Sequence, residues 1–269
     1  MTRSLIKRYV VLASCTILTL LFVFALNTYM NRAHGKLLHG TTVIVIKTRN
    51  DLVVAADSKG RRGTAIITSE SACKVGNVGL YYYAFAGAIN DPETGFNILT
   101  PIKEAISQSG SIVEVANRYE SMAGSLIAKQ VGYYREKYRN FYDSVFKNKS
   151  ASDVAFFGVE KDALVFHIRF FFVEETPDGK VTIQPKRIDC GADCENGDII
   201  LGEREEITKY MAVQPSLLKD VEAIEAVRTL IKEQIKVTPD SVGEPIDIVR
   251  LTIKRTEWIQ RKKECEAKK

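Results

Sequence analysis

The chain has 269 residues, which allows one or two domains, and its 45% hydrophobic and 26% charged residues exclude a disordered or fibrous protein. The formal net charge of +5 lies wholly in residues 1–40, which hold five basic and no acidic residues, so residues 41–269 are neutral. A nucleic-acid-binding protein usually carries its basic excess on the folded domain, so we expect no nucleic-acid partner.

An apolar run without charges spans residues 9–27 and follows three basic residues. Its length is close to the roughly 20 residues that cross a bilayer as a helix, and the basic flank favours a cytoplasmic N-terminus. We therefore expect residues 1–40 to comprise a basic stub, a transmembrane or signal segment and a propeptide. Whether this leader is a cleaved signal peptide or an uncleaved anchor, residues 41–269 are expected beyond the membrane, in a periplasm or a secretory lumen.

The body of the chain alternates blocks of strands with blocks of helices. In chain order, the patterns predict strands at 41–47, 52–56, 64–69 and 78–86, helices at 91–108 and 111–136, strands at 153–159, 163–173, 180–187 and 198–201, a helix at 217–236 and a strand at 246–254. Asp91-Pro92 is expected to open the first helix, and Ser111 with Glu114 has the spacing of a capping box at the start of the second. This order is typical of an α+β domain with two stacked sheets between helical layers.

The histidines and cysteines limit the chemistry of the body. The chain has three histidines, of which only His167 lies in residues 41–269, in a run typical of a strand that favours a structural role. We therefore expect neither a His-rich zinc site nor a histidine base. Cys190 and Cys194 form a close pair for which a disulfide, free thiols and metal ligation all stay open, although a metal would need two further ligands. No metal or other cofactor is expected.

Residues 40–87 carry the most specific pattern in the chain. Gly40 precedes Thr41 at the start of a strand pair, Asp57 follows Thr41 by sixteen residues, and a second glycine turn ends at Gly87. This pattern resembles the β-type subunits of proteasomes, which are N-terminal nucleophile (Ntn) hydrolases. The resemblance implies a four-layer αββα sandwich from residue 41 to about 260 and self-cleavage between Gly40 and Thr41.

The chemistry of such a site can be argued from the residues themselves. A threonine hydroxyl is a weak nucleophile that needs a base, and an α-amino group freed on the same residue, with a pKa of about 7.7–8.0, supplies one. A nearby ammonium polarises the hydroxyl, and a carboxylate holds that ammonium in place. We expect Thr41, Lys74 and Asp57 in these three roles, and the Gly87 N–H at the oxyanion. The predicted activity is hydrolysis of peptide or other amide bonds.

The sequence also departs from the family pattern. Without a gap, the position of the family's catalytic lysine falls on Cys73, and a one-residue bulge brings Lys74 there. A late Gly-Ser-Gly-Ser loop is replaced by residues 201–204, and the supporting Asp-x-x-Ser pattern is shifted at residues 240–243. Two other functions therefore stay open: a catalytically inactive assembly or binding module anchored to a membrane, and an unrelated anchored domain.

Tyrosines near the end of the predicted helix 111–136 suggest self-association. They are Tyr133, Tyr134, Tyr138 and Tyr142. Tyrosine is enriched at interfaces because it combines apolar area with a polar tip, so a homo-oligomer of the mature form is expected. A tyrosine-rich surface loop is the alternative interpretation.

Overall fold

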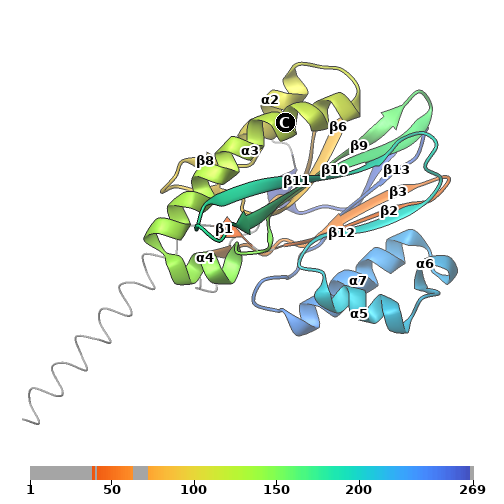
Figure 1. Cartoon of the computed structure of the whole chain (residues 1–269). Helices are drawn as coiled ribbons and strands as arrows, with labels where there is room; N and C mark the ends of the chain where they lie inside the picture. The colour runs from red at the N-terminus through yellow and green to blue at the C-terminus, as the bar shows by residue number, and fades with distance from the viewer. Residues whose placement is uncertain (1–37, 40, 63–71, 267–269) are drawn as a thin grey trace, which may run out of the picture.

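The computed structural model describes residues 38–39, 41–62 and 72–266 (Figure 1). The apolar run at 9–27, the predicted strand at 64–69 and Gly40 lie outside the described residues. Within the described part of the chain, no helix combines the length and the apolar character needed to cross a membrane.

Two five-stranded antiparallel sheets form the centre of the structure. The first has the order β12-β2-β3-β13-β14, with β2 at Thr42–Lys47, β3 at Leu52–Ala56, β12 at Gly197–Gly202, β13 at Asp247–Leu251 and β14 at Thr256–Gln260. The second has the order β11-β10-β9-β6-β5, with β5 at Val75–Val78, β6 at Tyr81–Gly87, β9 at Ser150–Glu160, β10 at Ala163–Glu175 and β11 at Val181–Cys190. Two-residue strands form a small third sheet, β4-β1-β7-β8, at Arg61–Arg62, Leu38–His39, Asn90–Asp91 and Phe96–Asn97.

Side chains that alternate along the strands build separate cores on the two faces of each sheet. Val43, Val45 and Val54 of the first sheet share one buried cluster with Ala84 and Phe157 of the second. The intervening side chains of β2 and β3 belong to another cluster, with α5 and α7. Because both faces of these strands are buried, residues 43–46 and 52–56 are two continuous apolar runs, separated by the polar turn between the strands.

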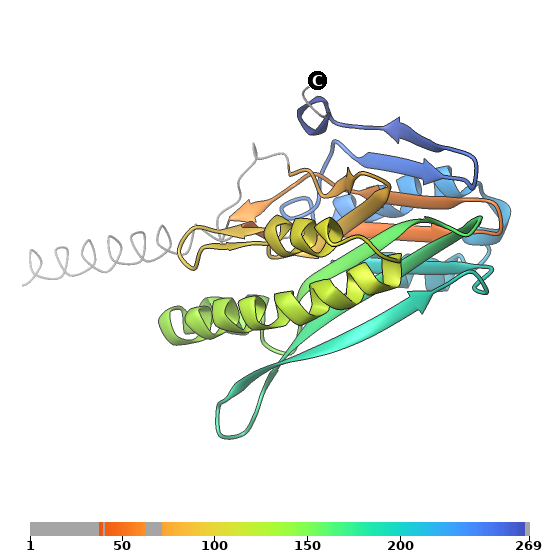
Figure 2. The ribbon, with the colours of Figure 1, turned by 90° about the horizontal axis from the view of Figure 1, so that it is seen from above.

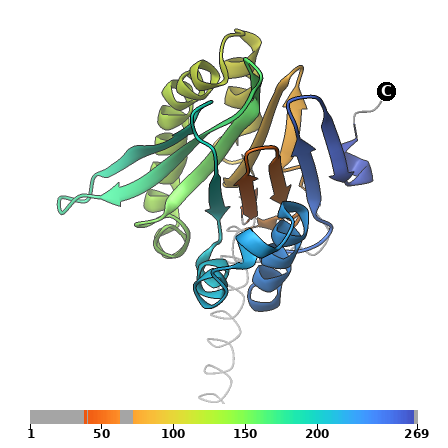
Figure 3. The same cartoon turned by 90° about the vertical axis from the view of Figure 1, so that its right-hand side faces the viewer.

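Two groups of helices cover the outer faces of the two large sheets, and Figure 3 shows them on opposite sides of the strands. The group against the second sheet comprises α2 at Leu99–Ser107, α3 at Ile112–Lys137 and α4 at Arg139–Val145. The group against the first sheet comprises α5 at Glu205–Val213, α6 at Leu217–Asp220 and α7 at Ala223–Val237. The predicted α+β class is confirmed, and the assignment to the four-layer Ntn sandwich stays a prediction.

The hairpin of β10 and β11 projects beyond the other strands (Figure 2). Glu175, at the end of β10, pairs with Arg135 of α3 and with Arg139 of α4. These guanidinium groups hold the pKa of the Glu175 carboxyl at about 2, well below its usual range. Charge pairing thus fastens the turn end of the hairpin to the helices.

The predicted strand at 78–86 corresponds largely to β6, but its predicted start is three residues too early. β5 ends at Val78 and β6 begins at Tyr81, with Gly79 and Leu80 in the turn. Gly79 has a φ of +59°, a left-handed conformation that glycine adopts without steric cost. The start was placed too early, and β5 was missed, because the apolar pattern continues across a two-residue turn.

The first helix begins at Leu99 and not at Asp91. The buried Asp91 carboxylate accepts hydrogen bonds from the Glu93 N–H (3.0 Å) and the Thr94 hydroxyl (2.6 Å). An aspartate that satisfies the backbone of its own turn competes with helix formation. The predicted start was therefore wrong, and the glycine turn at Gly87 leads into the short strands β7 and β8 before the helix.

The C-terminal third contains more elements than the sequence predicted. The helix expected at 217–236 is interrupted at Val221, whose backbone is extended, and so forms α6 and α7. The strand expected at 246–254 ends at Leu251, and a turn closed by the Thr252 N–H and the Arg255 carbonyl oxygen (2.8 Å) leads into β14. The helices α4 and α5 were not predicted, because each is short and buries one or two residues.

The four tyrosines do not form an exposed interface. Tyr134 and Tyr142 are buried, and Tyr134 packs against Phe141 and Phe146 with ring centroids 5.0 and 5.9 Å apart. They belong to the core between the second sheet and its helices. The interpretation as an interface was wrong for Tyr134 and Tyr142, whereas Tyr133 and Tyr138 are partly exposed and pack against this core, and the homo-oligomer stays a prediction.

Ser111→Ala is expected to lower the free energy of unfolding by about 1 kcal/mol, because Ser111 and Glu114 form a complete capping box at the start of α3. Urea denaturation measures the change. Ser121→Ala, at an exposed position within the same helix, is the matched control and should have a smaller effect. Equal effects of the two substitutions would contradict the capping role.

Candidate active site

A buried ion pair joins the end of β3 to the start of β5. The Lys74 Nζ lies 2.8 Å from the Asp57 Oδ1, and both side chains are fully buried. Lys74 also donates to the carbonyl oxygen of Lys59 (2.6 Å). The structure thus places Lys74, rather than Cys73, against Asp57, at the offset that a one-residue bulge requires.

Backbone donors surround the Asp57 carboxylate. Its Oδ1 accepts from the Thr42 N–H (2.9 Å), and its Oδ2 accepts from the N–H groups of Lys59 (2.9 Å) and Gly243 (3.1 Å). Together with Lys74, these donors come from four separate segments of the chain. The carboxylate therefore has one fixed orientation, and it connects Lys74 to the backbone of the residue that follows Thr41.

The ammonium of Lys74 loses its proton more readily than that of an ordinary lysine. Burial lowers the pKa of Lys74, and the neighbouring Lys262 ammonium lowers it further. The carboxylates of Asp57 and Glu203 oppose this shift without cancelling it. A lysine whose pKa is shifted by burial and by neighbouring charges is typical of a functional site.

Thr41 lies directly before β2 and is 1% exposed. Its carbonyl oxygen accepts from the Glu203 N–H (2.8 Å), and the Thr42 hydroxyl donates to the Glu203 carbonyl oxygen (2.8 Å). Gly202 has a φ of +75°, and a Cβ there would lie 2.1 Å from the Thr41 carbonyl oxygen. Only glycine permits this approach, so the segment of Gly202 and Glu203 holds the Thr41 backbone in place.

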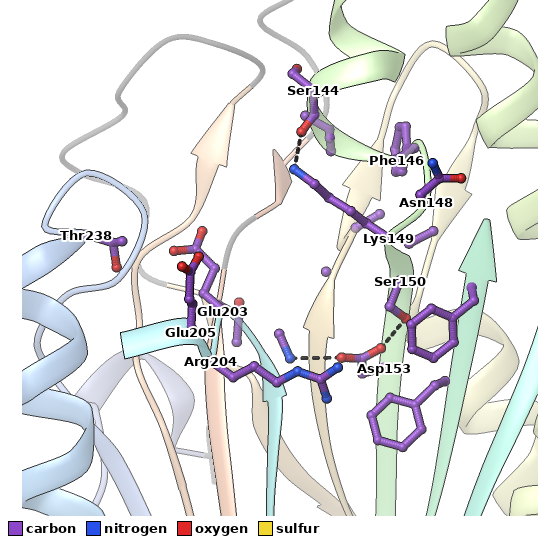
Figure 4. A pocket seen from close by; sticks show the side chains of 18 of the residues that line it. Ser144, Phe146, Asn148, Lys149, Ser150, Asp153, Glu203, Arg204, Glu205 and Thr238 are labelled. Carbon is purple, nitrogen blue, oxygen red and sulfur yellow. Dashed lines mark hydrogen bonds between the residues drawn. The ribbon is translucent and has the colours of Figure 1, made fainter. Parts of the chain in front are cut away.

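Thr41 lines a cavity of about 720 Å³. Figure 4 shows other side chains of its lining. The lining combines Thr41 and Gly87 with the start of β9, the end of β12 and part of α7, and it includes Lys149, Asp153, Phe170, Arg204 and Thr238. The structure thus brings two predicted site residues, Thr41 and Gly87, to one cavity. The Asp57–Lys74 pair lies outside the lining and is linked to it through the Thr42 N–H.

Gly87 ends β6 with a φ of +98°, and a Cβ there would lie 2.5 Å from the Ala151 carbonyl oxygen. The next residue, Ala88, donates its N–H to that same oxygen (3.0 Å). Because hydrogen-bonded pairs alternate along an antiparallel ladder, the Gly87 N–H points away from β9. Glycine is therefore required here by the backbone, and its N–H is not directed at the neighbouring strand.

Asp153, which the sequence analysis did not select, joins the two large sheets at the cavity. The carboxylate on β9 accepts from the Gly202 N–H of β12 (2.8 Å) and from the Ser150 hydroxyl, and Arg204 lies beside it (Figure 4). Burial raises the pKa of the Asp153 carboxyl, while these donors and Arg204 act in the opposite direction. A charged residue inside the apolar run of β9 was the available signal.

Other predicted residues have supporting positions. Ser241, in the shifted Asp-x-x-Ser pattern, donates its hydroxyl to the Glu203 carboxylate (2.6 Å). His167 is buried with its Nδ1 2.8 Å from the Asp189 Oδ1 and does not line the cavity, as its structural interpretation requires.

The structure contains two disulfides among the described residues. Cys190 and Cys194 form the small loop that was one of the open alternatives. Cys73 is bonded to Cys265, a residue 192 positions away. This second pairing was missed, because neither cysteine has a neighbour in the sequence that indicates its partner.

Comparisons with known proteins give a weak similarity. No family model and no curated protein matches the chain. A solved structure of Anbu from Hyphomicrobium sp. strain MC1 has 18% sequence identity and a TM-score of 0.45, over 81% of this chain and 87% of that chain. A mutant of the same protein has 18% identity and a TM-score of 0.43, over 82% and 88%. With both TM-scores below 0.5, this similarity by itself assigns neither a family nor an activity.

Asp57→Asn and Lys74→Met should each lower the free energy of unfolding by about 3–5 kcal/mol, because each leaves a buried charge without its partner. The double variant should lose less than the sum of the two, since it contains no unpaired charge. Urea denaturation of the four proteins measures this coupling. Lys236→Ala removes an exposed pair with Glu233 and should stay close to wild type. Additive losses would contradict a direct Asp57–Lys74 interaction.

Proposed function

We propose that this chain is a self-processing threonine hydrolase of the Ntn type, which cleaves peptide or other amide bonds with Thr41 as nucleophile. One observation carries the proposal: the fully buried Asp57–Lys74 pair is bonded to the backbone beside Thr41, at a cavity that Thr41 lines. The arrangement of sheets and helices supports, as part of this proposal, the family's four-layer αββα sandwich.

The energetic cost of the buried pair favours a functional role. Burying two charges is often no more stabilising than packing apolar side chains of similar volume. A pair retained under this cost, beside a cavity and a candidate nucleophile, is a candidate for catalysis. It supports Lys74 as the group that keeps a positive charge close to Thr41 and Asp57 as the group that orients it.

In the proposed self-processing step, the Thr41 Oγ attacks the carbonyl carbon of Gly40. The bond from that carbon to the Thr41 nitrogen breaks, the resulting ester is hydrolysed by water, and residues 1–40 leave with a new carboxylate. Thr41 then has a free α-amino group whose reference pKa of about 7.7–8.0 provides a neutral fraction near neutral pH.

In the proposed hydrolytic cycle, the neutral α-amino group takes the proton of the Thr41 hydroxyl as the oxygen attacks the substrate carbonyl. The Gly87 N–H donates to the oxyanion, and the Lys74 ammonium stabilises the developing negative charge. The α-amino group passes its proton to the leaving amine, and an ester with Thr41 remains. Water, deprotonated by the same amine, then hydrolyses the ester and restores the hydroxyl.

The cavity limits the substrate class. A volume of about 720 Å³ lies within the roughly 300–1,000 Å³ of small-ligand sites, so it accommodates a short peptide segment or a small acyl amide. We further propose that residues 1–40 deliver the body across a membrane before processing releases it. The mature form is proposed to act without a cofactor and to associate as a homo-oligomer.

A binding or assembly module without activity is the second candidate. It is favoured by the replacement of the family's serine loop by Gly202 and Glu203, whose backbone is occupied with Thr41 and Thr42. The two candidates differ in one outcome, because only the hydrolase removes its own leader.

Purified wild-type protein should begin at Thr41, with a mass reduced by that of residues 1–40, because the Thr41 hydroxyl performs the cleavage. Thr41→Ala should leave the full-length chain. Intact mass and N-terminal sequencing read both results, and Thr48→Ala serves as a control at a turn outside the cavity. A mature start elsewhere, or cleavage that persists in Thr41→Ala, would refute self-processing.

Asp57→Asn and Lys74→Ala should each slow the release of residues 1–40 by 10²-fold or more, which is the usual scale for a positioned acid–base group. The time course of the precursor after cell-free synthesis measures the rate. Lys103→Ala, an exposed lysine on α2, should process like wild type. Circular dichroism identifies variants that do not fold, and a folded Lys74→Ala chain with wild-type processing would exclude Lys74 from the mechanism.

A further inference from the structure

A second buried ammonium lies behind the candidate site, in the segment that follows β14. The Lys262 side chain is fully buried, with its Nζ 3.2 Å from the Asp247 Oδ2. The Lys262 N–H donates to the Asp247 Oδ1 (2.8 Å), so lysine and aspartate are joined through backbone and side chain.

Lys262 also bonds to the segment that carries Lys74. Its Nζ donates to the carbonyl oxygen of Ala72, two residues before Lys74. The Ala72 N–H in turn donates to the Ser58 carbonyl oxygen (2.9 Å), next to Asp57. The backbone that leads into Lys74 is therefore held from the Asp57 side and from the C-terminal segment.

A covalent bond fixes the same segment one residue further on. Cys73, adjacent to Lys74, forms a disulfide with Cys265 in the short 3₁₀ helix Lys263–Cys265. Residues 72 and 73 are thus tied to residues 262 and 265 by two neighbouring links. Because Cys73 is exposed, a thiol reductant reaches this disulfide from solvent.

The two ion pairs form one buried group of four charges, Asp57, Lys74, Asp247 and Lys262. Asp247 lies opposite Ala56 in the β3–β13 ladder, one residue before Asp57. Burial lowers the pKa of both lysines; the Lys262 ammonium lowers that of Lys74 further, and the Asp57 carboxylate opposes the shift of Lys262. Glu203 is the further charge that acts on Lys74. Lys262 neutralises Asp247, which leaves Asp57 as the partner of Lys74.

We propose that Lys262 is a positioning residue, held by the Cys73–Cys265 disulfide, that fixes Lys74 against Asp57 and makes the oxidised chain the competent form. This inference rests on the proposed function of the Thr41 site. A displacement of about 1 Å at a catalytic group can cost about 10²-fold in rate, so loss of either link should be measurable. A disulfide that forms in an oxidising compartment would complete the site only after export.

The first test follows processing of the full chain after cell-free synthesis. Wild type should release residues 1–40 in a buffer with glutathione disulfide, and dithiothreitol should slow this release about 10-fold or more. Dithiothreitol is oxidised to its cyclic disulfide as Cys73 and Cys265 are reduced to thiols. Cys265→Ser should be slow in both buffers. The double variant Cys190→Ser/Cys194→Ser should keep the sensitivity to dithiothreitol, because among the described residues it retains the disulfide at Cys73.

The second test separates Lys262 from general damage to the fold. Lys262→Met/Asp247→Asn removes both charges of the second pair and leaves no buried ion unpaired, so it should fold and process about 10-fold more slowly. Lys263→Ala, the exposed neighbour, should match wild type. The pKa of Lys74 should be higher in Lys262→Met/Asp247→Asn than in Asp247→Asn alone, because the nearby positive charge of Lys262 is gone. The ¹³C NMR shift of the Lys74 Cε measures this pKa.

The outcomes distinguish this inference from the proposed function. Processing at the wild-type rate, both by wild type in dithiothreitol and by Lys262→Met/Asp247→Asn, would overturn the inference. It would leave the proposed Thr41 hydrolase intact. A wild-type chain that does not process in the oxidising buffer overturns the proposed function. In that case the link between Lys262 and Lys74 is tested by the pKa of Lys74. An equal pKa in Lys262→Met/Asp247→Asn and in Asp247→Asn alone would overturn this link.

Discussion

A charge buried away from water must be paired with an opposite charge inside the protein. Two buried lysines and two buried aspartates therefore constrain the fold. An unpaired ion in the interior costs several kcal/mol, so Asp57, Lys74, Asp247 and Lys262 must meet in one place. They come from the end of β3, the start of β5, the start of β13 and the segment after β14. The strand order of the first sheet, with β13 beside β3, brings the two aspartates together.

The cavity lies at the junction of the two large sheets, since β9 belongs to one sheet and β12 to the other. The Asp153 carboxylate crosses this junction to the Gly202 N–H, and Glu203 continues the contact to Thr41 and Thr42. A substitution in either sheet that alters their separation would therefore move the walls of the cavity relative to Thr41.

Local patterns predicted local structure well. Alternating and continuous apolar runs gave β2, β3, β9 and β10, and the capping box at Ser111 gave the start of α3. The contact between Asp57 and Lys74 was also predicted, because both residues lie within one motif. Asp153, Lys262 and Cys265 were not, since their roles depend on partners that are distant in the sequence. The predicted helix start at Asp91 was wrong because the Asp91 side chain accepts a hydrogen bond from the Glu93 N–H and so stabilises a turn.

The Cys73–Cys265 bond also changes the topology of the polypeptide, because it closes a covalent ring around most of the body. A force applied between the two ends of the chain could lengthen only the segments outside residues 73–265, since the bond carries the load past everything between them. A single proteolytic cut within the ring would leave both fragments attached.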